Sequence, residues 1–73
     1  MGEMKVTAEV AGRVCALPFS VGAAVKEGDD VAVIEAMKME IPVPSPGAGT
    51  IRALAVSVDE VVAEGQTLVV LET

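Results

Sequence analysis

Histidine, tryptophan and tyrosine are absent from this chain of 73 residues, and cysteine and phenylalanine each occur once. Without histidine, neither a Ser-His-Asp nor a Cys-His nucleophile system can be built. A structural zinc site needs several cysteine or histidine ligands, and a disulfide within the chain needs two cysteines. These classes of protein are therefore excluded, and the single Cys15 fits a reducing compartment.

Positive charge is also scarce. Five lysine and arginine residues stand against eleven aspartate and glutamate residues, so that the net charge is −6. Binding to a phosphate backbone needs a basic surface, and base stacking needs several aromatic rings. We therefore expect no nucleic-acid partner.

Long apolar runs are missing as well. The longest, such as 31–34 and 68–71, contain four residues, whereas a membrane-spanning helix needs about 20. The first residues have no long apolar run behind a basic start, which a signal peptide requires. We expect no membrane association and a cytoplasmic location; a mature organellar protein or a domain of a longer chain is the alternative.

What the chain does contain is an internal repeat. A shift of 37 positions aligns its two halves, roughly 4–36 and 41–73. Because a solenoid needs about three or more repeats, two halves predict one closed domain over 1–73 with pseudo-twofold symmetry. Each half should supply half of one core. The shift aligns Ala11-Gly12 with Ala48-Gly49, Ala16-Leu17 with Ala53-Leu54, Ser20-Val21 with Ser57-Val58, and Glu27-Gly28 with Glu64-Gly65.

Short valine-rich runs between glycine, proline and aspartate residues predict an all-β fold. Irregular alternation predicts a bulge near Ala16-Leu17 and its repeat near Ala53-Leu54. Pro42 and Pro44 lack N–H groups and so belong on an edge strand. The best architecture is a flattened antiparallel barrel or sandwich of two small sheets. The expected strands are 4–8, 12–20, 24–26, 30–36, 39–44, 49–57, 61–63 and 67–72.

For the segment 34–41, helix propensity and the repeat predict different secondary structures. Its alanine, methionine, lysine and glutamate residues favour a helix, but Pro42 would stop that helix after about two turns. The repeat instead matches 34–35 to the end of a strand at 71–72, which predicts a hairpin with Met37-Lys38 at its tip. Tight turns favour glycine, asparagine or aspartate, because φ is positive there. Since an exposed site that breaks local rules is often functional, this tip is the candidate site.

Glu35-Ala36-Met37-Lys38-Met39-Glu40 resembles the attachment motif of biotinyl domains, the biotin carboxyl carrier family. The resemblance covers nearly the whole chain and includes Gly12-x-Val14, Gly49-x-Ile51 and Gly65-Gln66-x-Leu68. It implies a flattened β-barrel of two four-stranded sheets with the modified lysine on a protruding hairpin. This agrees with the architecture predicted from the repeat.

The resemblance also implies a function. Lys38 would form an amide with biotin, with Glu35, Ala36, Met37 and Met39 as the rest of the attachment site. The protein would be a non-catalytic carrier of a carboxyl group in an acyl-CoA carboxylase, and a monomer in isolation. Its partners would be a biotin protein ligase, a biotin carboxylase and a carboxyltransferase. The two methionines would be adaptable contacts for these partners; alternatively, they fold back and cap the end of the barrel.

Two other functions stay open. A lipoyl carrier of a 2-oxoacid dehydrogenase system would share the fold, but that family usually has Asp-Lys-Ala at the tip. An unmodified structural module, as in efflux adaptor proteins, needs no tip lysine. One departure from the biotinyl pattern is Asp59, which stands where the family usually has glycine and where the repeat has Gly22. Aspartate tolerates a left-handed backbone better than most residues, so we expect the turn to persist.

Overall fold

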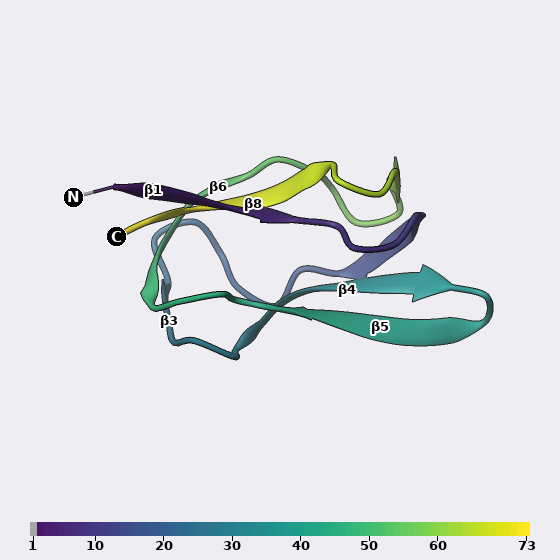
Figure 1. Cartoon of the computed structure of the whole chain (residues 1–73), viewed down its shortest axis with the longest axis horizontal. Coiled ribbons are helices and arrows are strands. Elements are labelled where there is room, and N and C mark those ends of the chain that lie inside the picture. The colour runs from purple at the N-terminus through teal and green to yellow at the C-terminus, as the bar shows by residue number, and fades with distance from the viewer. Residues whose placement is uncertain (1) are drawn as a thin grey trace.

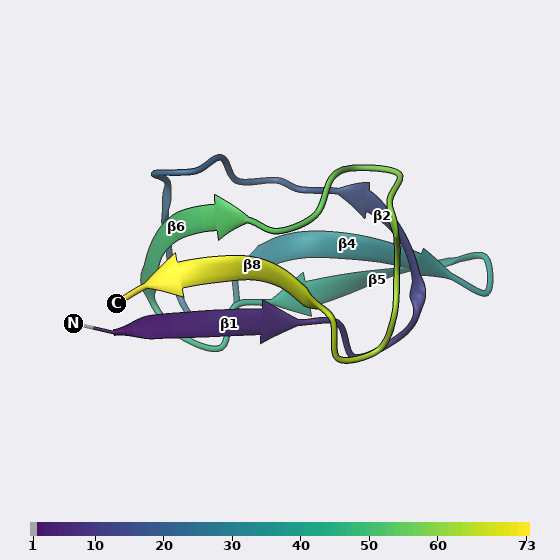
Figure 2. The ribbon, with the colours of Figure 1, turned by 90° about the horizontal axis from the view of Figure 1, so that it is seen from above.

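The computed structural model describes residues 2–73, which form two four-stranded antiparallel sheets and no helix (Figures 1 and 2). All eight expected strands are present, and three have the expected bounds, over 30–36, 39–44 and 67–72. The strands are β1 (Glu3–Thr7), β2 (Gly12–Ala16), β3 (Ala24–Val25), β4 (Asp30–Ala36), β5 (Met39–Pro44), β6 (Gly49–Leu54), β7 (Val61–Val62) and β8 (Thr67–Glu72).

The order of the strands confirms the predicted twofold relation. One sheet has the order β1-β8-β6-β3 and the other β5-β4-β2-β7. A shift of 37 residues turns β1 to β4 into β5 to β8, and it therefore exchanges the two sheets. Each sheet takes two strands from each half, so neither half can complete a sheet alone.

Four strands are shorter than expected: β3 and β7 by one residue each, and β2 and β6 by more. The predicted strands 12–20 and 49–57 end at Ala16 and Leu54. The register shifts between Val14 and Ala16 and again between Ile51 and Ala53, one or two residues before the predicted bulges. A bulge bends the strand out of its ladder, and Pro18 has no N–H group to continue the first one.

One core lies between the sheets. Repeat-related residues such as Val14 and Ile51 occupy equivalent places in it, and both are at most 1% exposed. Ile34 is fully buried and pairs with Ile41, so the helical alternative for 34–41 is wrong. Tertiary pairing outweighed local helix propensity there. The largest fully buried side chains are Ile34, Ile51, Leu68, Leu71, Val14, Val31 and Val69.

The molecule is elongated, with extents of 36 × 17 × 17 Å. The β4–β5 hairpin protrudes at one end of the long axis and both termini lie at the other (Figures 1 and 2). The N–H of Gly2 donates to the carbonyl of Thr73 over 3.1 Å, and the N–H of Thr73 donates to Gly2 over 2.9 Å. The chain ends are therefore held together far from the hairpin.

The strand carrying Pro42 and Pro44, β5, is an edge strand as predicted. Proline cannot donate a ladder hydrogen bond, so these residues keep the edge from pairing with another strand. Within residues 2–73, the structure contains no helix long and apolar enough to cross a membrane.

Candidate functional site

The tip of the β4–β5 hairpin is a two-residue turn. Ala36 pairs with Met39, which leaves Met37 and Lys38 as the loop. Their φ angles are 51° and 63°, and positive φ at both loop residues is the signature of a type I′ turn. A left-handed non-glycine residue costs on the order of 1 kcal/mol or more. The well-formed ladder behind the turn holds the two residues in this strained conformation.

The tip side chains point into water. Met37 is 89% exposed and Met39 63% exposed, so the alternative in which the methionines cap the barrel is wrong. Lys38 is exposed, and none of the ion pairs among residues 2–73 involves it. Its primary amine is accessible to another protein, as attachment of a cofactor through an amide requires.

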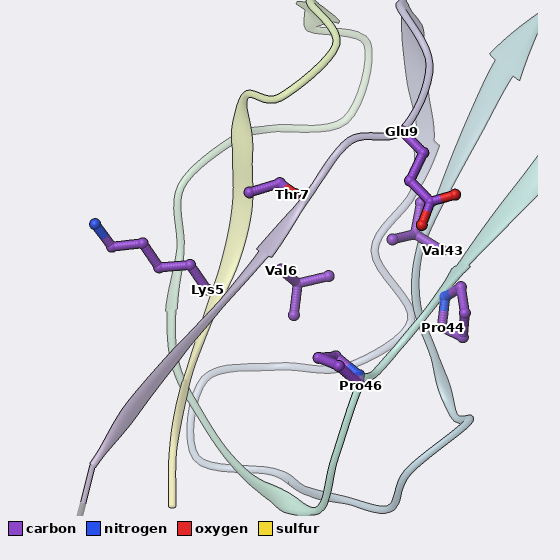
Figure 3. Close-up of a pocket in the computed structure, with 7 residues that line it drawn as sticks. All are labelled: Lys5, Val6, Thr7, Glu9, Val43, Pro44 and Pro46. Atoms are coloured by element: carbon purple, nitrogen blue, oxygen red, sulfur yellow. The ribbon is translucent and has the colours of Figure 1, made fainter.

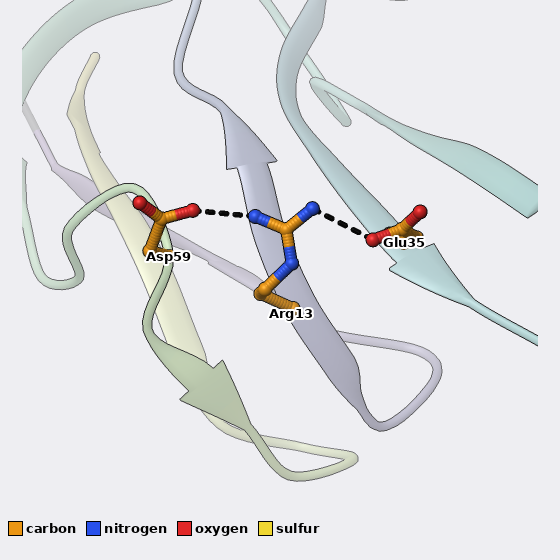
Figure 4. Close-up of polar contacts among 3 residues, drawn as sticks. All are labelled: Arg13, Glu35 and Asp59. Atoms are coloured by element: carbon orange, nitrogen blue, oxygen red, sulfur yellow. Dashed lines mark hydrogen bonds and ion pairs between the residues drawn. The ribbon is translucent and has the colours of Figure 1, made fainter. Parts of the chain in front are cut away.

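Behind the turn, one arginine binds two carboxylates (Figure 4). Arg13 on β2 donates to Glu35 on β4 over 2.6 Å and to Asp59 over 2.5 Å. The hydrogen bond and the charge of Glu35 raise the pKa of Arg13 above its usual value. Glu35 lies directly opposite Glu40 in the hairpin, and like charges in such a pair destabilise a sheet. Arg13 offsets that repulsion at the base of the hairpin.

Asp59 keeps the glycine-like conformation that its place in the repeat predicts. Its φ is 78°, against 95° for Gly22. Its ion pair with Arg13, 46 residues away, was not predicted. The only signal was the replacement itself, because an acidic side chain stands where the repeat has glycine. The repeat has Thr50 in place of Arg13, so this ion-paired arrangement belongs to one half alone.

Exchange of the residues at these two turns should have unequal effects. We expect Gly22→Asp to lower the free energy of unfolding by about 1 kcal/mol, because it adds backbone strain without an arginine to bind. Asp59→Gly should change stability less, since relief of strain opposes loss of the Arg13 ion pair. Urea unfolding of both variants measures the difference. A larger loss for Asp59→Gly would contradict this balance.

The strain at Met37 predicts a conflict between stability and recognition. Asparagine tolerates positive φ, so Met37→Asn should stabilise the domain by up to about 1 kcal/mol. It should also slow attachment at Lys38, because an exposed, adaptable side chain is lost. Thermal unfolding and the initial rate of modification measure the two effects. Met39→Asn, within β5, is the control and should bring no stabilisation.

Neither a metal centre nor a cavity accounts for this site. Residues 2–73 contain no group of three histidine, cysteine, aspartate or glutamate side chains placed to hold a metal. A cavity of about 200 Å³ lies between β1 and β5 (Figure 3), away from the turn residues. The cavity is lined by Lys5, Val6, Thr7, Glu9, Val43, Pro44 and Pro46. Cys15, which the repeat aligns with Arg52, is half-buried at the bulge of β2.

Comparison with known families agrees with the hairpin and the fold. The family of biotin/lipoyl attachment domains, described as "Biotin-requiring enzyme", matches residues 8–71, and the chain belongs to it. The biotinylated protein TB7.3 homolog of Mycobacterium leprae is 36% identical over 66 residues, which cover 90% of this chain and 93% of the relative. The biotin/lipoyl attachment protein of Bacillus subtilis is 31% identical over 68 residues and 93% of each chain.

Solved structures show the same architecture inside larger enzymes. A single-chain, multi-domain long-chain acyl-CoA carboxylase matches 99% of this chain with a TM-score of 0.91 and 33% identity. The urea carboxylase of Kluyveromyces lactis matches 99% with a TM-score of 0.92 and 28% identity. This chain spans only 7% and 6% of those two proteins.

A more distant match shows the fold alone. A putative efflux transporter from Bacteroides eggerthii has a TM-score of 0.85 at 15% identity; the match covers 96% of this chain and 39% of that one. Together, the comparisons confirm the predicted family, the all-β fold of two four-stranded sheets, and biotin as the cofactor of the family.

Proposed function

We propose that this protein carries biotin on Lys38 and transfers a carboxyl group between a biotin carboxylase and the carboxyltransferase of an acyl-CoA carboxylase. The observation that supports this most is the position of Lys38. It lies in a strained turn at one end of the long axis, between two exposed methionines. The names of the relatives and the carboxylases with this fold support the same proposal.

The chemistry of attachment fits the residues at the tip. The Lys38 nitrogen attacks the carbonyl of an activated biotin, an amide bond forms, and the adenylate leaving group departs with the electron pair of the broken bond. The ammonium loses a proton before this attack. Because the chain has no histidine, the ligase supplies the base. Attachment removes one positive charge, so the net charge changes from −6 to −7.

The protein itself then provides position rather than catalysis. Biotin supplies a ureido nitrogen that accepts and releases a carboxyl group. The rigid hairpin keeps this group outside the barrel, and both termini lie at the opposite end. A linker attached to either terminus would therefore leave the tip unobstructed and raise its effective concentration at both enzymes. We expect the carrier to be a monomer, because Pro42 and Pro44 protect the β5 edge.

Intact mass spectrometry tests the proposal. The purified domain is incubated with ATP and either biotin plus a biotin protein ligase, or lipoate plus a lipoate ligase. We expect the mass of one biotinyl group in the first reaction and no change in the second. A lipoyl addition alone would instead identify a lipoyl carrier. No addition in either reaction would favour an unmodified module and overturn the proposal.

A further inference from the structure

Four side chains form a row across one sheet immediately behind the lysine turn. Glu40 pairs with Glu35, Glu35 with Arg13, and Arg13 with Val61. Paired residues on neighbouring strands project from the same face of a sheet. The next residues along the strands, Ile34 and Val14, are fully buried, so these four side chains project outward. We call them the hairpin row.

The pseudo-twofold axis provides a natural comparison. The equivalent row on the other sheet is Glu3, Glu72, Thr50 and Ala24, beside the chain termini. We call it the terminal row. Its small Ala24 occupies the place that Val61, 77% exposed, takes in the hairpin row. The two rows share a backbone arrangement and two glutamates, and they differ where Arg13 and Val61 stand in place of Thr50 and Ala24.

The ion pairs also differ between the rows. In the terminal row, Glu3 is bound by Arg52. Its counterpart in the hairpin row is Glu40, which takes part in none of the ion pairs of residues 2–73, because the repeat has Cys15 at the position of Arg52. An unpaired carboxylate therefore stands two residues after Lys38. Glu40, Glu35 and Asp59 against Arg13 give these four side chains a charge of −2, without the positive charge of Lys38 itself.

Exposed apolar side chains gather around the same row. Of the five exposed large hydrophobic residues in the described chain, four belong to this end: the two tip methionines, Val61 of the row, and Val58 (49% exposed). The fifth is Val21, the repeat partner of Val58 in the other half (60% exposed). Val58 precedes Asp59, which Arg13 binds to the sheet. This ion pair supplements two backbone hydrogen bonds that hold the loop 57–60 beside the row, from the Asp59 N–H to the Val14 carbonyl (2.7 Å) and from the Val14 N–H to the Glu60 carbonyl (2.9 Å). The outer face of β5-β4-β2-β7 thus joins the turn in one rigid surface with both apolar and acidic groups.

We propose that the biotin protein ligase docks on the hairpin row and the Val58 loop, and so approaches the tip from this side. The inference rests on the proposed function of Lys38. Before biotin is attached, only four methylene groups separate the lysine nitrogen from its backbone. The ligase must therefore cover the surface beside the turn, whereas later enzymes meet a longer arm. Three spacings of about 4.8 Å make the row roughly 14 Å wide, well within a footprint of about 800 Å².

The charge of the face indicates the chemistry of the partner. Glu40, Glu35 and Asp59 outnumber Arg13, so the matching ligase surface carries cationic groups around an apolar contact for Val61 and Val58. Electrostatic complementarity of this kind accelerates association and is weakened by salt. The rate of biotin attachment should therefore fall as ionic strength rises.

A pair of symmetry-related substitutions tests the docking face. Val61→Arg and Ala24→Arg each add one positive charge at equivalent, exposed positions, and arginine offers no competing acceptor for biotin. With a biotin protein ligase, biotin and ATP, we expect kcat/KM to fall about tenfold for Val61→Arg, mainly through KM. It should change less than about twofold for Ala24→Arg. Thermal unfolding of both variants checks that each is folded.

A second pair of variants removes one negative charge without enlarging the side chain. Glu40→Gln should reduce the salt dependence of the rate, whereas its counterpart Glu3→Gln should leave it unchanged. Equal effects of the two variants in each pair would overturn the docking face. The proposed function would stand in that case if the unsubstituted domain still gained one biotinyl group. Absence of any gain in the unsubstituted domain would overturn both.

Discussion

Replacement of Lys38 by arginine is expected to abolish the mass gain from biotin completely. Arginine keeps the positive charge on a slightly longer side chain, but its delocalised guanidinium stays protonated and cannot act as the amine nucleophile. The turn should keep its conformation, because both residue types are unbranched at Cβ. Intact mass spectrometry after incubation with ligase, biotin and ATP measures the loss.

The chain offers a matched control for this substitution. It contains two other lysines, Lys5 on β1 and Lys26 before the turn at Gly28. Lys5→Arg combined with Lys26→Arg should leave the mass gain unchanged. A persistent mass gain in Lys38→Arg, lost instead in the double variant, would show that biotin is attached elsewhere.

Gly12→Ala should produce the largest loss of stability among single methyl additions to the barrel. A Cβ at Gly12 would lie 2.4 Å from the carbonyl oxygen of Glu35 and 2.7 Å from Cγ2 of Ile34. Backbone cannot yield as a flexible side chain does, so β2 and β4 must separate. Overpacking of this kind costs about 1–3 kcal/mol, and in a domain of this size 2 kcal/mol lowers Tm by roughly 10 °C. Calorimetry measures the shift.

The same substitution should also affect the lysine turn, because β4 leads directly into that turn. We expect slower biotin attachment to Gly12→Ala at temperatures near its lowered Tm. Gly47→Ala is the control, since its added Cβ would meet only the flexible end of Met4, at 3.1 Å. A Tm for Gly12→Ala within about 2 °C of that control would contradict the close approach of β2 and β4.

Much of the fold could be predicted because the two halves of the sequence repeat the same pattern. The repeat of 37 residues assigned 34–35 and 71–72 to equivalent strand ends, and this outweighed the helix propensity of 34–41. The hairpin tip followed from the same alignment, and the positive φ of Met37 and Lys38 confirms that the turn breaks the usual rules. The lengths of β2 and β6 were predicted wrongly, because hydrophobic alternation does not show where a bulge ends a ladder.

The eight strands, their twofold relation and the lysine at the tip could be predicted from the residues alone, since these depend on apolar periodicity, turn residues and a local motif. Which charges meet depends instead on how the strands are arranged in space. Arg13 and Asp59 are 46 residues apart, and their contact depends on the order β4-β2-β7, which no local pattern encodes. That contact has no equivalent in the other half, where Thr50 and Gly22 stand at these positions, and it makes the two ends of a nearly symmetric barrel chemically different.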